Sequence, residues 1–220
     1  MSEVIAIFAR FPRLGKVKTR LAASVGAEAA LQFHEAFLLD TIDRLVCVPA
    51  DLTLFLADST EEENRQFAQF HTLPARLRLC CQNGSDLGQR MWHAYGELSR
   101  SSHKVVFVGT DSPTLPLSFF REAREQLRRY PVVLAPAADG GYCLLGLSRP
   151  VPEIFTAIPW GTSKVLSATR ERLGHKDYYE LPHWYDVDGV EDLKILNNDL
   201  SACDPIPRRT AALLASKRFQ

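Results

Sequence analysis

Apolar segments alternate with amphipathic ones along most of the chain. Residues 4–9 are a continuous apolar run, and 104–109 contain the apolar run VVFV, which is typical of strands buried on both faces of a parallel sheet. Shorter or alternating apolar segments predict further strands at 51–58, 76–82, 132–137, 142–147 and 178–182. Apolar positions at helical spacing predict helices at about 31–46, 63–70, 86–100, from 118 onward, and at 163–173, 190–197 and 207–217.

This alternation predicts an α/β fold with three layers, α/β/α, around a mostly parallel central sheet. One irregular or antiparallel element is expected after residue 137, because Asp139-Gly140-Gly141 separates two neighbouring strands as a hairpin or a tight loop would. The chain has 220 residues and no obvious linker, so a single domain over 1–220 is favoured over two small ones. Sheets of this kind bind ligands at the carboxyl ends of their strands, which makes the residues after each strand the candidates for function.

Composition narrows the class of protein. Lys and Arg number 26, as do Asp and Glu, and this zero net charge argues against a nucleic-acid or membrane-surface binder. No apolar run approaches the ~20 residues of a membrane helix, and Glu3 interrupts any secretory leader. The five cysteines show no zinc-ligand spacing, so they are interpreted as reduced thiols of a cytoplasmic protein.

A local cluster of positive charge follows the first predicted strand. The segment FPRLGKVKTRL contains no acidic residue, and Lys16, Lys18 and Arg20 can converge on one anion. Phosphate is the natural candidate, since charged donors combine there with the amino end of a following helix. The segment is neither a Walker A loop nor a dinucleotide fingerprint. The alternative is a solvated basic face, and Arg10 and Arg13, at the start of the loop, are expected to matter less.

Two groups of acidic residues follow predicted strands. Asp111 comes directly after the predicted strand 104–109, where a carboxylate suits Mg²⁺; the alternative is a residue that begins a turn. Asp186 and Asp188 alternate, so in an extended stretch they share a face, and either is a candidate second metal ligand. The alternative for Asp188 is a capping box with Glu191.

Two further segments have a structural and a functional interpretation. Asp86 with Gln89 matches a capping box, although Arg90 one turn later makes a ligand contact an alternative. The glycines of 139–141 either let a ligand approach the backbone or form only a tight turn.

Six motifs in order resemble one bacterial family. They are FPRLGKVKTRL, GSDLGQRM, GTDSP, DGGYCLLG, IPWGTS and DVD, which together span residues 11–188. The chain resembles GT-A-fold transferases of the nucleotide-diphospho-sugar transferase superfamily, in particular glycosyltransferases of the arsenosugar-biosynthesis type that are associated with radical-SAM proteins. The first loop is also similar to that of 2-phospho-lactate guanylyltransferase.

The resemblance implies a role for each matching residue. Lys18 and Asp111 would be catalytic, and Asp111 and Asp188 would bind Mg²⁺ or Mn²⁺. The nucleotide and its phosphates would contact Arg13, Gly15, Lys16, Lys18, Arg20, Asp86 and Arg90. The sugar or acceptor would contact Asp139, Gly140, Gly141, Tyr142 and Trp160. The chain departs from the family at Asn83-Gly84-Ser85, where an acidic residue or a glycine is usual, which leaves the role of the 83–90 loop open.

The expected function is therefore magnesium-dependent transfer from a nucleotide-activated donor to a small-molecule acceptor. Glycosyl transfer from a nucleotide sugar follows the superfamily. Nucleotidyl transfer from a nucleoside triphosphate is the alternative, because three basic residues in one loop suit a triphosphate. A non-catalytic nucleotide-binding protein on the same fold is a further alternative. The oligomeric state is not predicted.

Overall fold

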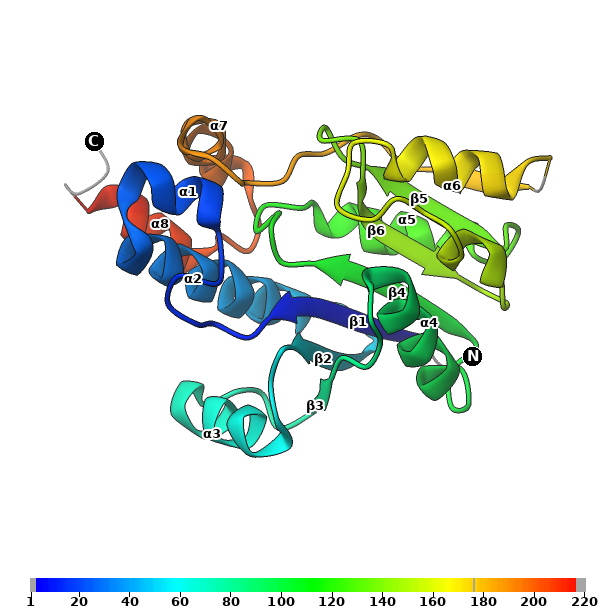
Figure 1. Ribbon diagram of the computed structural model, residues 1–220, viewed down its shortest axis with the longest axis horizontal. Helices are drawn as coiled ribbons and strands as arrows, with labels where there is room; N and C mark the ends of the chain where they lie inside the picture. The colour runs from blue at the N-terminus through cyan, green and yellow to red at the C-terminus, as the bar shows by residue number, and fades with distance from the viewer. Residues whose placement is uncertain (1–2, 176, 217–220) are drawn as a thin grey trace.

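A mixed sheet runs through the middle of the described chain, residues 3–175 and 177–216 of a computed structural model (Figure 1). Its order is β3-β2-β1-β4-β6-β5-β7. The strands are β1 (Glu3–Arg10), β2 (Asp51–Ala57), β3 (Leu77–Cys81), β4 (Lys104–Gly109), β5 (Val132–Pro136), β6 (Tyr142–Leu147) and β7 (Tyr178–Glu180). Only β6 runs against its neighbours β4 and β5, which confirms the predicted antiparallel element after residue 137.

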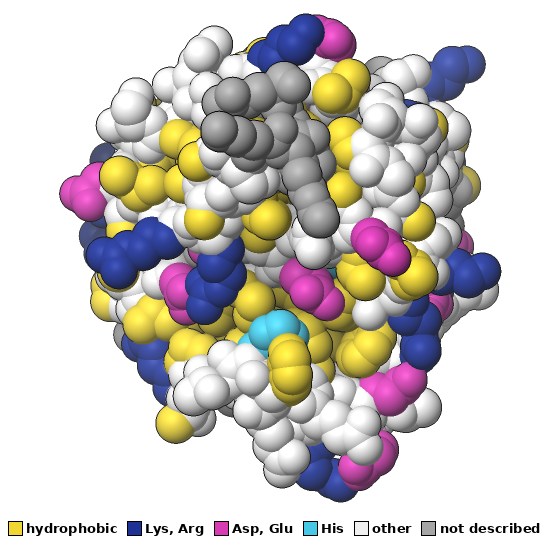
Figure 2. Space-filling view, turned by 90° about the vertical axis from the view of Figure 1, so that its left-hand side faces the viewer, with side chains coloured by type: hydrophobic (Ala, Val, Ile, Leu, Met, Phe, Trp, Pro, Cys, Tyr) yellow, Lys and Arg dark blue, Asp and Glu magenta, His cyan; other side chains and the backbone are white. Residues whose placement is uncertain are grey.

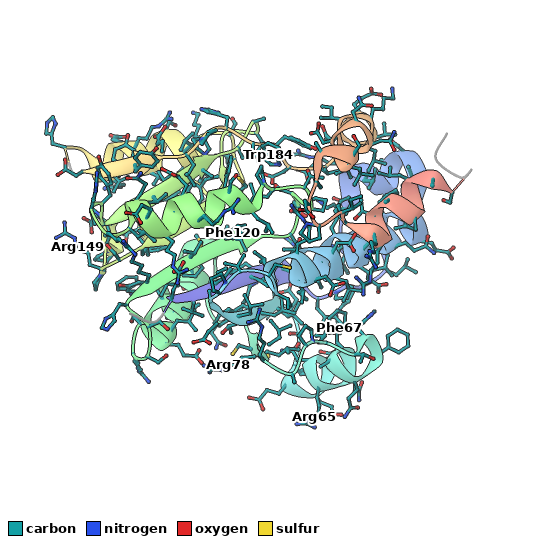
Figure 3. The ribbon with its side chains drawn as sticks, turned by 180° about the vertical axis from the view of Figure 1, so that it is seen from behind. Arg65, Phe67, Arg78, Phe120, Arg149 and Trp184 are labelled. Atoms are coloured by element: carbon teal, nitrogen blue, oxygen red, sulfur yellow. The ribbon has the colours of Figure 1, made fainter. Side chains whose placement is uncertain are left out.

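Helices cover both faces of this sheet. They are α1 (Thr19–Val25), α2 (Ala27–Leu45), α3 (Glu61–His71), α4 (Leu87–Leu98), α5 (Leu117–Gln126), α6 (Val165–Leu173), α7 (Val190–Asp199) and α8 (Arg208–Ala215), with 3-10 turns η1 (Pro152–Phe155) and η2 (Leu200–Ala202). Apolar side chains of α2, α3 and α5 pack on one face, and those of α4, α6 and η1 on the other. The view from behind shows the first of these faces, with Phe120 on α5 and Phe67 on α3 (Figure 3). The predicted three-layer α/β/α fold is confirmed.

The two central strands are buried on both faces, as their apolar sequence predicts. Ile5 and Ile7 join the core under α2, whereas Ala6 faces the core under α4. β4 alternates in the same way beside β1, with Ile5 opposite Val106 and Ile7 opposite Val108 in parallel register. The carboxyl ends of β1 and β4 therefore lie side by side at one edge of the sheet.

The last part of the chain returns to the first helices. Val187, Leu193 and Leu196 pack with Leu21 and Phe33 in a third apolar cluster. Figure 1 shows α7 and α8 beside α1 and α2, at the end of the molecule toward which β1 points. The segment 181–189, which leads into α7, is thereby drawn across the carboxyl edge of the sheet. Within the described residues, no helix combines the length and apolarity that crossing a membrane requires.

Several predicted boundaries differ from the structure by a few residues; α2, for example, begins at Ala27 and not at about 31. The helix predicted to reach 46 ends at Leu45, and Val46 is exposed because the chain turns there. The helix predicted over 207–217 covers 208–215, and residue 217 lies outside the described residues.

Candidate active site

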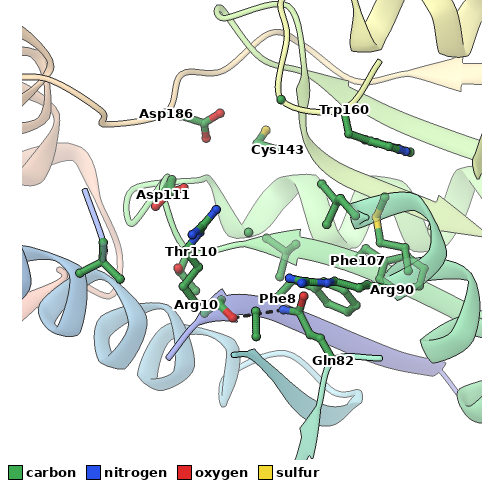
Figure 4. A pocket seen from close by; sticks show the side chains of 18 of the residues that line it. Phe8, Arg10, Gln82, Arg90, Phe107, Thr110, Asp111, Cys143, Trp160 and Asp186 are labelled. Carbon is green, nitrogen blue, oxygen red and sulfur yellow. Dashed lines mark hydrogen bonds between the residues drawn. The ribbon is translucent and has the colours of Figure 1, made fainter. Parts of the chain in front are cut away.

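A cleft of about 760 Å³ opens at the carboxyl ends of β1, β3 and β4. Its volume is within the range of small-molecule sites in proteins. Phe8, Gln82 and Phe107 line one part of it, and Asp111 and Asp186 face another part (Figure 4). The cleft therefore combines an aromatic part with a charged part, as a nucleotide would require.

The basic loop that follows β1 wraps the charged part of the cleft. Gly15 has φ +72° in a turn that the Lys16 N–H closes by donating to the Arg13 carbonyl at 3.0 Å. Lys18 then adopts a left-handed backbone, φ 47° and ψ 46°, immediately before α1. This conformation is rare for a residue with a side chain. Buried Val17 and Leu21 on either side anchor the backbone, so the Lys18 side chain is aimed inward.

Lys18 lies between two carboxylates. Its Nζ is 2.5 Å from Asp111 Oδ1 and 3.3 Å from Asp188 Oδ1, and only 3% of the side chain is exposed. Burial by itself lowers the pKa of Lys18, but the two carboxylates outweigh it, so the pKa lies above its ordinary value. Burial is the largest single influence on the pKa of Asp111 and raises it, but the charge and hydrogen bond of Lys18, together with the charges of His34 and Arg10, outweigh burial, so that pKa lies below its ordinary value. The charged pair is thus the stable form at neutral pH.

The Asp188 carboxylate is free for this role because another residue caps α7. The N-cap is Gly189, and Asp192 Oδ2 accepts from the N–H groups of Asp188 (2.9 Å) and Gly189 (2.7 Å). The predicted capping box of Asp188 with Glu191 is therefore wrong by one residue. Asp188 instead faces Lys18, and its second oxygen lies 3.6 Å from Arg20 Nη1.

Asp186 is the third carboxylate of this part of the cleft. The hydroxyl of Ser112 donates to it at 2.5 Å. Burial raises the pKa of Asp186 to about 6, and the nearby charges of Asp111 and Asp139 add to the shift. Asp186 therefore differs from Asp188, which is paired with cations.

The remaining residues of the basic loop separate into two groups. Lys16 and Arg20 are exposed side chains that line the cleft beside Lys18. Arg13 instead forms an ion pair with Glu63 of α3 at 2.6 Å and donates to the Asp58 carbonyl. On the end of the molecule formed by α1, α7 and α8, basic side chains lie among acidic ones rather than in one patch (Figure 2). Lys16, Lys18 and Arg20 therefore meet at the cleft, whereas Arg13 and Gly15 do not line it.

The loop before α4 forms another wall of the cleft. Asp86 is the N-cap of α4 and accepts from Gln89 N at 2.8 Å, so its carboxylate has a structural role. Arg90 donates from Nε to the Gly84 carbonyl at 3.1 Å, which leaves part of its guanidinium facing the cleft. Gly84 has φ +139°, and a Cβ there would lie 2.8 Å from Arg90 N, so this position requires glycine.

The hairpin between β5 and β6 contributes to the cleft only through its second strand. Asp139 Oδ1 accepts from Gly141 N at 2.8 Å in a tight turn, and a Cβ on Gly140 would lie 2.2 Å from the Ser163 carbonyl oxygen. Asp139, Gly140 and Gly141 do not line the cleft, but Tyr142 does. Trp160 lies against its ring, with 6.3 Å between the ring centroids.

Trp160 is fixed in place by α4. A Cβ on Gly88 would lie 2.4 Å from Trp160 Nε1, so the ring packs directly on the backbone of α4. Figure 4 shows Trp160 on the wall of the cleft away from Asp111. Its place agrees with the sugar or acceptor side, which stays a prediction.

The oxygen atoms at the charged part suit a hard divalent cation. Asp111, Asp188 and the Val187 carbonyl all point at one position, the kind of ligand set that Mg²⁺ or Mn²⁺ prefers. In the structure the Lys18 ammonium lies at that position. Within the described ranges, no three His, Cys, Asp or Glu side chains group closely enough to hold a metal. The chemistry of the donors fits a metal with two protein carboxylates, provided that Lys18 moves.

Several polar residues of the cleft were not predicted as site residues, among them His34, Gln82 and Arg10. His34 of α2 is buried, and its Nε2 lies 2.9 Å from the Arg10 carbonyl. Burial lowers the pKa of His34, with Asp111 acting in the opposite direction. Gln82 uses its side-chain amide to donate to the carbonyls of Ala9 and Phe55. The Arg10 side chain also lines the cleft. Arg10 and Gln82 each lie at the end of a strand, the signal that would have identified them.

Comparisons with known proteins agree with this architecture. A protein from Desulfovibrio desulfuricans G20, named as a putative nucleotide-diphospho-sugar transferase, is 33% identical over 97% of this chain and 94% of its own, with a TM-score of 0.87. A 4-diphosphocytidyl-2C-methyl-D-erythritol synthase from Anaerococcus prevotii DSM 20548 shares the fold at 13% identity, with a TM-score of 0.60 over 91% of this chain and 98% of its own. Rv0371c from Mycobacterium tuberculosis H37Rv, in complex with manganese, shares it at 15% identity, with a TM-score of 0.56 over 89% and 97%.

No curated protein matches the chain. The family model described as "Uncharacterized protein conserved in bacteria (DUF2064)" matches residues 40–162, which is more than half of the chain. This family fits the nucleotide-diphospho-sugar transferase-like superfamily that the motifs resemble. The cleft, the sheet order and the sequence match lead to one conclusion, that the chain belongs to the DUF2064 family on a nucleotide-diphospho-sugar transferase-like fold.

Proposed function

We propose that the protein is a transferase that takes a group from a nucleotide-activated donor, and that glycosyl transfer from a nucleotide sugar is its reaction. The observation that carries the proposal is the ion-paired group of Lys18, Asp111 and Asp188 at the carboxyl edge of the sheet, with Lys16 and Arg20 beside it. The name of the 33% identical relative supports a nucleotide-diphospho-sugar as donor.

The charged part of the cleft suits the phosphates of such a donor. Departure of a nucleoside diphosphate leaves negative charge on phosphate oxygens, which positioned cations stabilise. Lys16 and Arg20 can contact those oxygens directly, because both side chains line the cleft. A divalent cation, which the manganese complex of a fold relative supports, would be held by Asp111 and Asp188 and would supply Lewis-acid stabilisation.

The opposite wall suits the part of the substrate that reacts. Tyr142 and Trp160 present aromatic surface that can exclude water from a sugar ring. Asp186 lies in the cleft with a pKa raised to about 6, which suits a group that accepts a proton from an acceptor hydroxyl. These residues would orient the acceptor and remove its proton.

Nucleotidyl transfer is the second candidate. Lys16, Lys18 and Arg20 reach the cleft from a single loop, and three cations match a triphosphate better than a diphosphate. The synthase from Anaerococcus prevotii, a fold relative, supports this reading by its name. The two reactions differ in product, since glycosyl transfer releases a nucleoside diphosphate and nucleotidyl transfer releases pyrophosphate. Release of pyrophosphate alone from a panel of donors would overturn the glycosyl assignment.

Nucleotide binding is tested by a matched pair of loop variants. Lys16→Ala should weaken binding of the nucleotide that stabilises the protein most, roughly tenfold, which is the loss of one charged hydrogen bond of about 1.5 kcal/mol. Arg13→Ala, in the same loop but paired with Glu63, should leave affinity unchanged. Thermal-shift screening of nucleoside triphosphates and nucleotide sugars, with and without Mg²⁺, followed by calorimetry on both variants, measures this.

Two outcomes would contradict the proposal. If Lys16→Ala and the wild type bind the nucleotide with equal affinity, the basic loop does not contact phosphate and is only a solvated basic face. Tight nucleotide binding without turnover of any donor would instead favour a non-catalytic nucleotide-binding protein.

A further inference from the structure

The ammonium of Lys18 contacts three oxygen atoms in the charged part of the cleft. Nζ lies 2.5 Å from Asp111 Oδ1, 2.5 Å from the Val187 carbonyl and 3.3 Å from Asp188 Oδ1. An ammonium has three hydrogens to donate, so these three acceptors satisfy it completely. Arg20, which pairs with the same Asp188, is 78% exposed, whereas the Lys18 side chain is 3% exposed.

The backbone and the core hold Lys18 in this position. The left-handed conformation of Lys18 is fixed between buried Val17 and Leu21, and its Nζ lies 5.5 Å from the centre of the Phe37 ring. Only the end of the side chain can therefore move, because the stem is enclosed and the backbone is anchored.

The ammonium of Lys18 occupies the carboxylates that would hold a metal ion. A divalent cation held by Asp111 and Asp188 would compete with Lys18 for the two carboxylates that its Nζ contacts. The Lys18 side chain is 3% exposed, so water screens its ammonium poorly, and a second cation so close to it would be repelled. Lys18 and a metal ion therefore exclude each other from this pair of carboxylates, as long as nothing draws the ammonium away.

An anion bound in the cleft could draw the Lys18 ammonium away from the two carboxylates. Lys18 lines the same cleft as Lys16 and Arg20, so a phosphate held by those two side chains offers new acceptors to Nζ. We infer that Lys18 is an internal counter-ion of the Asp111–Asp188 pair, which an anionic ligand displaces, so that a divalent cation and the phosphates of the donor bind together and not separately. This inference rests on the proposed function, since it takes the phosphates of the donor as the anion.

Removing the ammonium should create a metal site that needs no anion. The experiment titrates Mn²⁺, without nucleotide, into the wild type and into Lys18→Met, and follows free Mn²⁺ by electron paramagnetic resonance. The wild type should bind Mn²⁺ weakly, and Lys18→Met at least about tenfold more tightly, because its two carboxylates have lost their cation. The double variant Lys18→Met with Asp111→Asn should lose that gain. Equal Mn²⁺ affinity in the wild type and Lys18→Met, whether tight or weak, would overturn the inference.

A second variant and a second ligand keep the test decisive. If Lys18→Met does not fold, Lys18→Gln provides the same comparison, because its amide can donate to the same carboxylates without a charge. In the wild type, the nucleotide found by thermal shift should raise Mn²⁺ affinity, and Mn²⁺ should raise nucleotide affinity by the same factor. If Lys18→Met gains Mn²⁺ affinity but no nucleotide binds the wild type, the proposed function fails while the counter-ion role stands. If nucleotides bind but the two Mn²⁺ titrations agree, only the inference fails.

Discussion

Asp186, a partly buried carboxylate, lowers the stability of the folded protein when it ionises. Its folded pKa of about 6 lies above the ordinary value of 3.8, so the folded state binds more protons than the unfolded state between these pH values. Stability attributable to Asp186 therefore falls as pH rises through this window, and the cost of ionising it remains above pH 6. Asp186→Asn removes that cost and keeps an oxygen to accept from Ser112. The variant should be more stable than the wild type by about 1–2 kcal/mol at pH 7.5, and by roughly half of that at pH 5.

Thermal or urea unfolding at the two pH values measures this difference. Asp51→Asn, at the exposed first residue of β2, is the control and should change stability at neither pH. If the stability difference between Asp186→Asn and the wild type is the same at pH 5 and pH 7.5, the substitution acts through packing and not through ionisation of Asp186.

Individual residues of the site were predictable where their position alone decides their role. Lys18 and Asp111 each follow a buried strand, and parallel strands that are neighbours bring such residues together, as the 2.5 Å ion pair confirms. The partner of each charge was not predictable. Asp188 and Asp192 both stand near the start of a helix, and which one caps it depends on a shift of one residue in the helix start. Arg13 turned away because Glu63, 50 residues later, lies close to it in space.

At the scale of elements, the β5–β6 hairpin positions α6 through one glycine. Gly140 has φ +89° and no room for a Cβ, and its carbonyl accepts from Leu166 N at 2.8 Å, near the start of α6. Gly140→Ala should lower the free energy of unfolding by about 2–3 kcal/mol, because the new methyl group meets the Ser163 carbonyl in a strained conformation. Gly96→Ala, in open space on α4, should instead raise it by up to about 1 kcal/mol. Urea denaturation measures both free energies of unfolding. If Gly140→Ala leaves the free energy of unfolding unchanged, the backbone at Ser163 can move aside for the new methyl group.

Most elements could be predicted because their signals are local. Apolar runs, helical spacing and the Asp-Gly-Gly turn identified the strands, the helices and the hairpin within a few residues. Helix α1 was not predicted as a separate helix, because the apolar pattern predicts only one helix in this region, at about 31–46. In the structure Gly26, with φ +86°, separates α1 from α2. Local signals of this kind do not state how strands pair, because pairing joins residues far apart in the chain.

At the scale of the whole molecule, the two ends of the chain hold the site together. The sheet order places β1 beside the central strand β4, and α7 and α8 return from the far edge to pack beside α1 and α2 (Figure 1). The segment that carries Asp186 and Asp188 crosses the sheet edge on this return path, where the Val187 N–H donates to the Asp111 carbonyl at 2.8 Å. The site therefore depends on contacts that the sequence pattern did not reveal, above all the docking of α8 on α2.

Asp40 makes that docking directly testable. It is 2% exposed on α2, and its carboxylate accepts from the N–H groups of Arg209 (3.1 Å) and Thr210 (2.7 Å) at the start of α8. Asp40→Ala leaves these donors without an acceptor in a buried place, and should lower the free energy of unfolding by about 2–3 kcal/mol. Asp43→Ala, which removes only an exposed ion pair to Arg209, should cost less than about 1 kcal/mol. Urea denaturation gives both values, and amide hydrogen exchange should show faster exchange in 208–215 for Asp40→Ala alone. Equal effects of the two variants would mean that α8 is held by its apolar contacts and not by the Asp40 carboxylate.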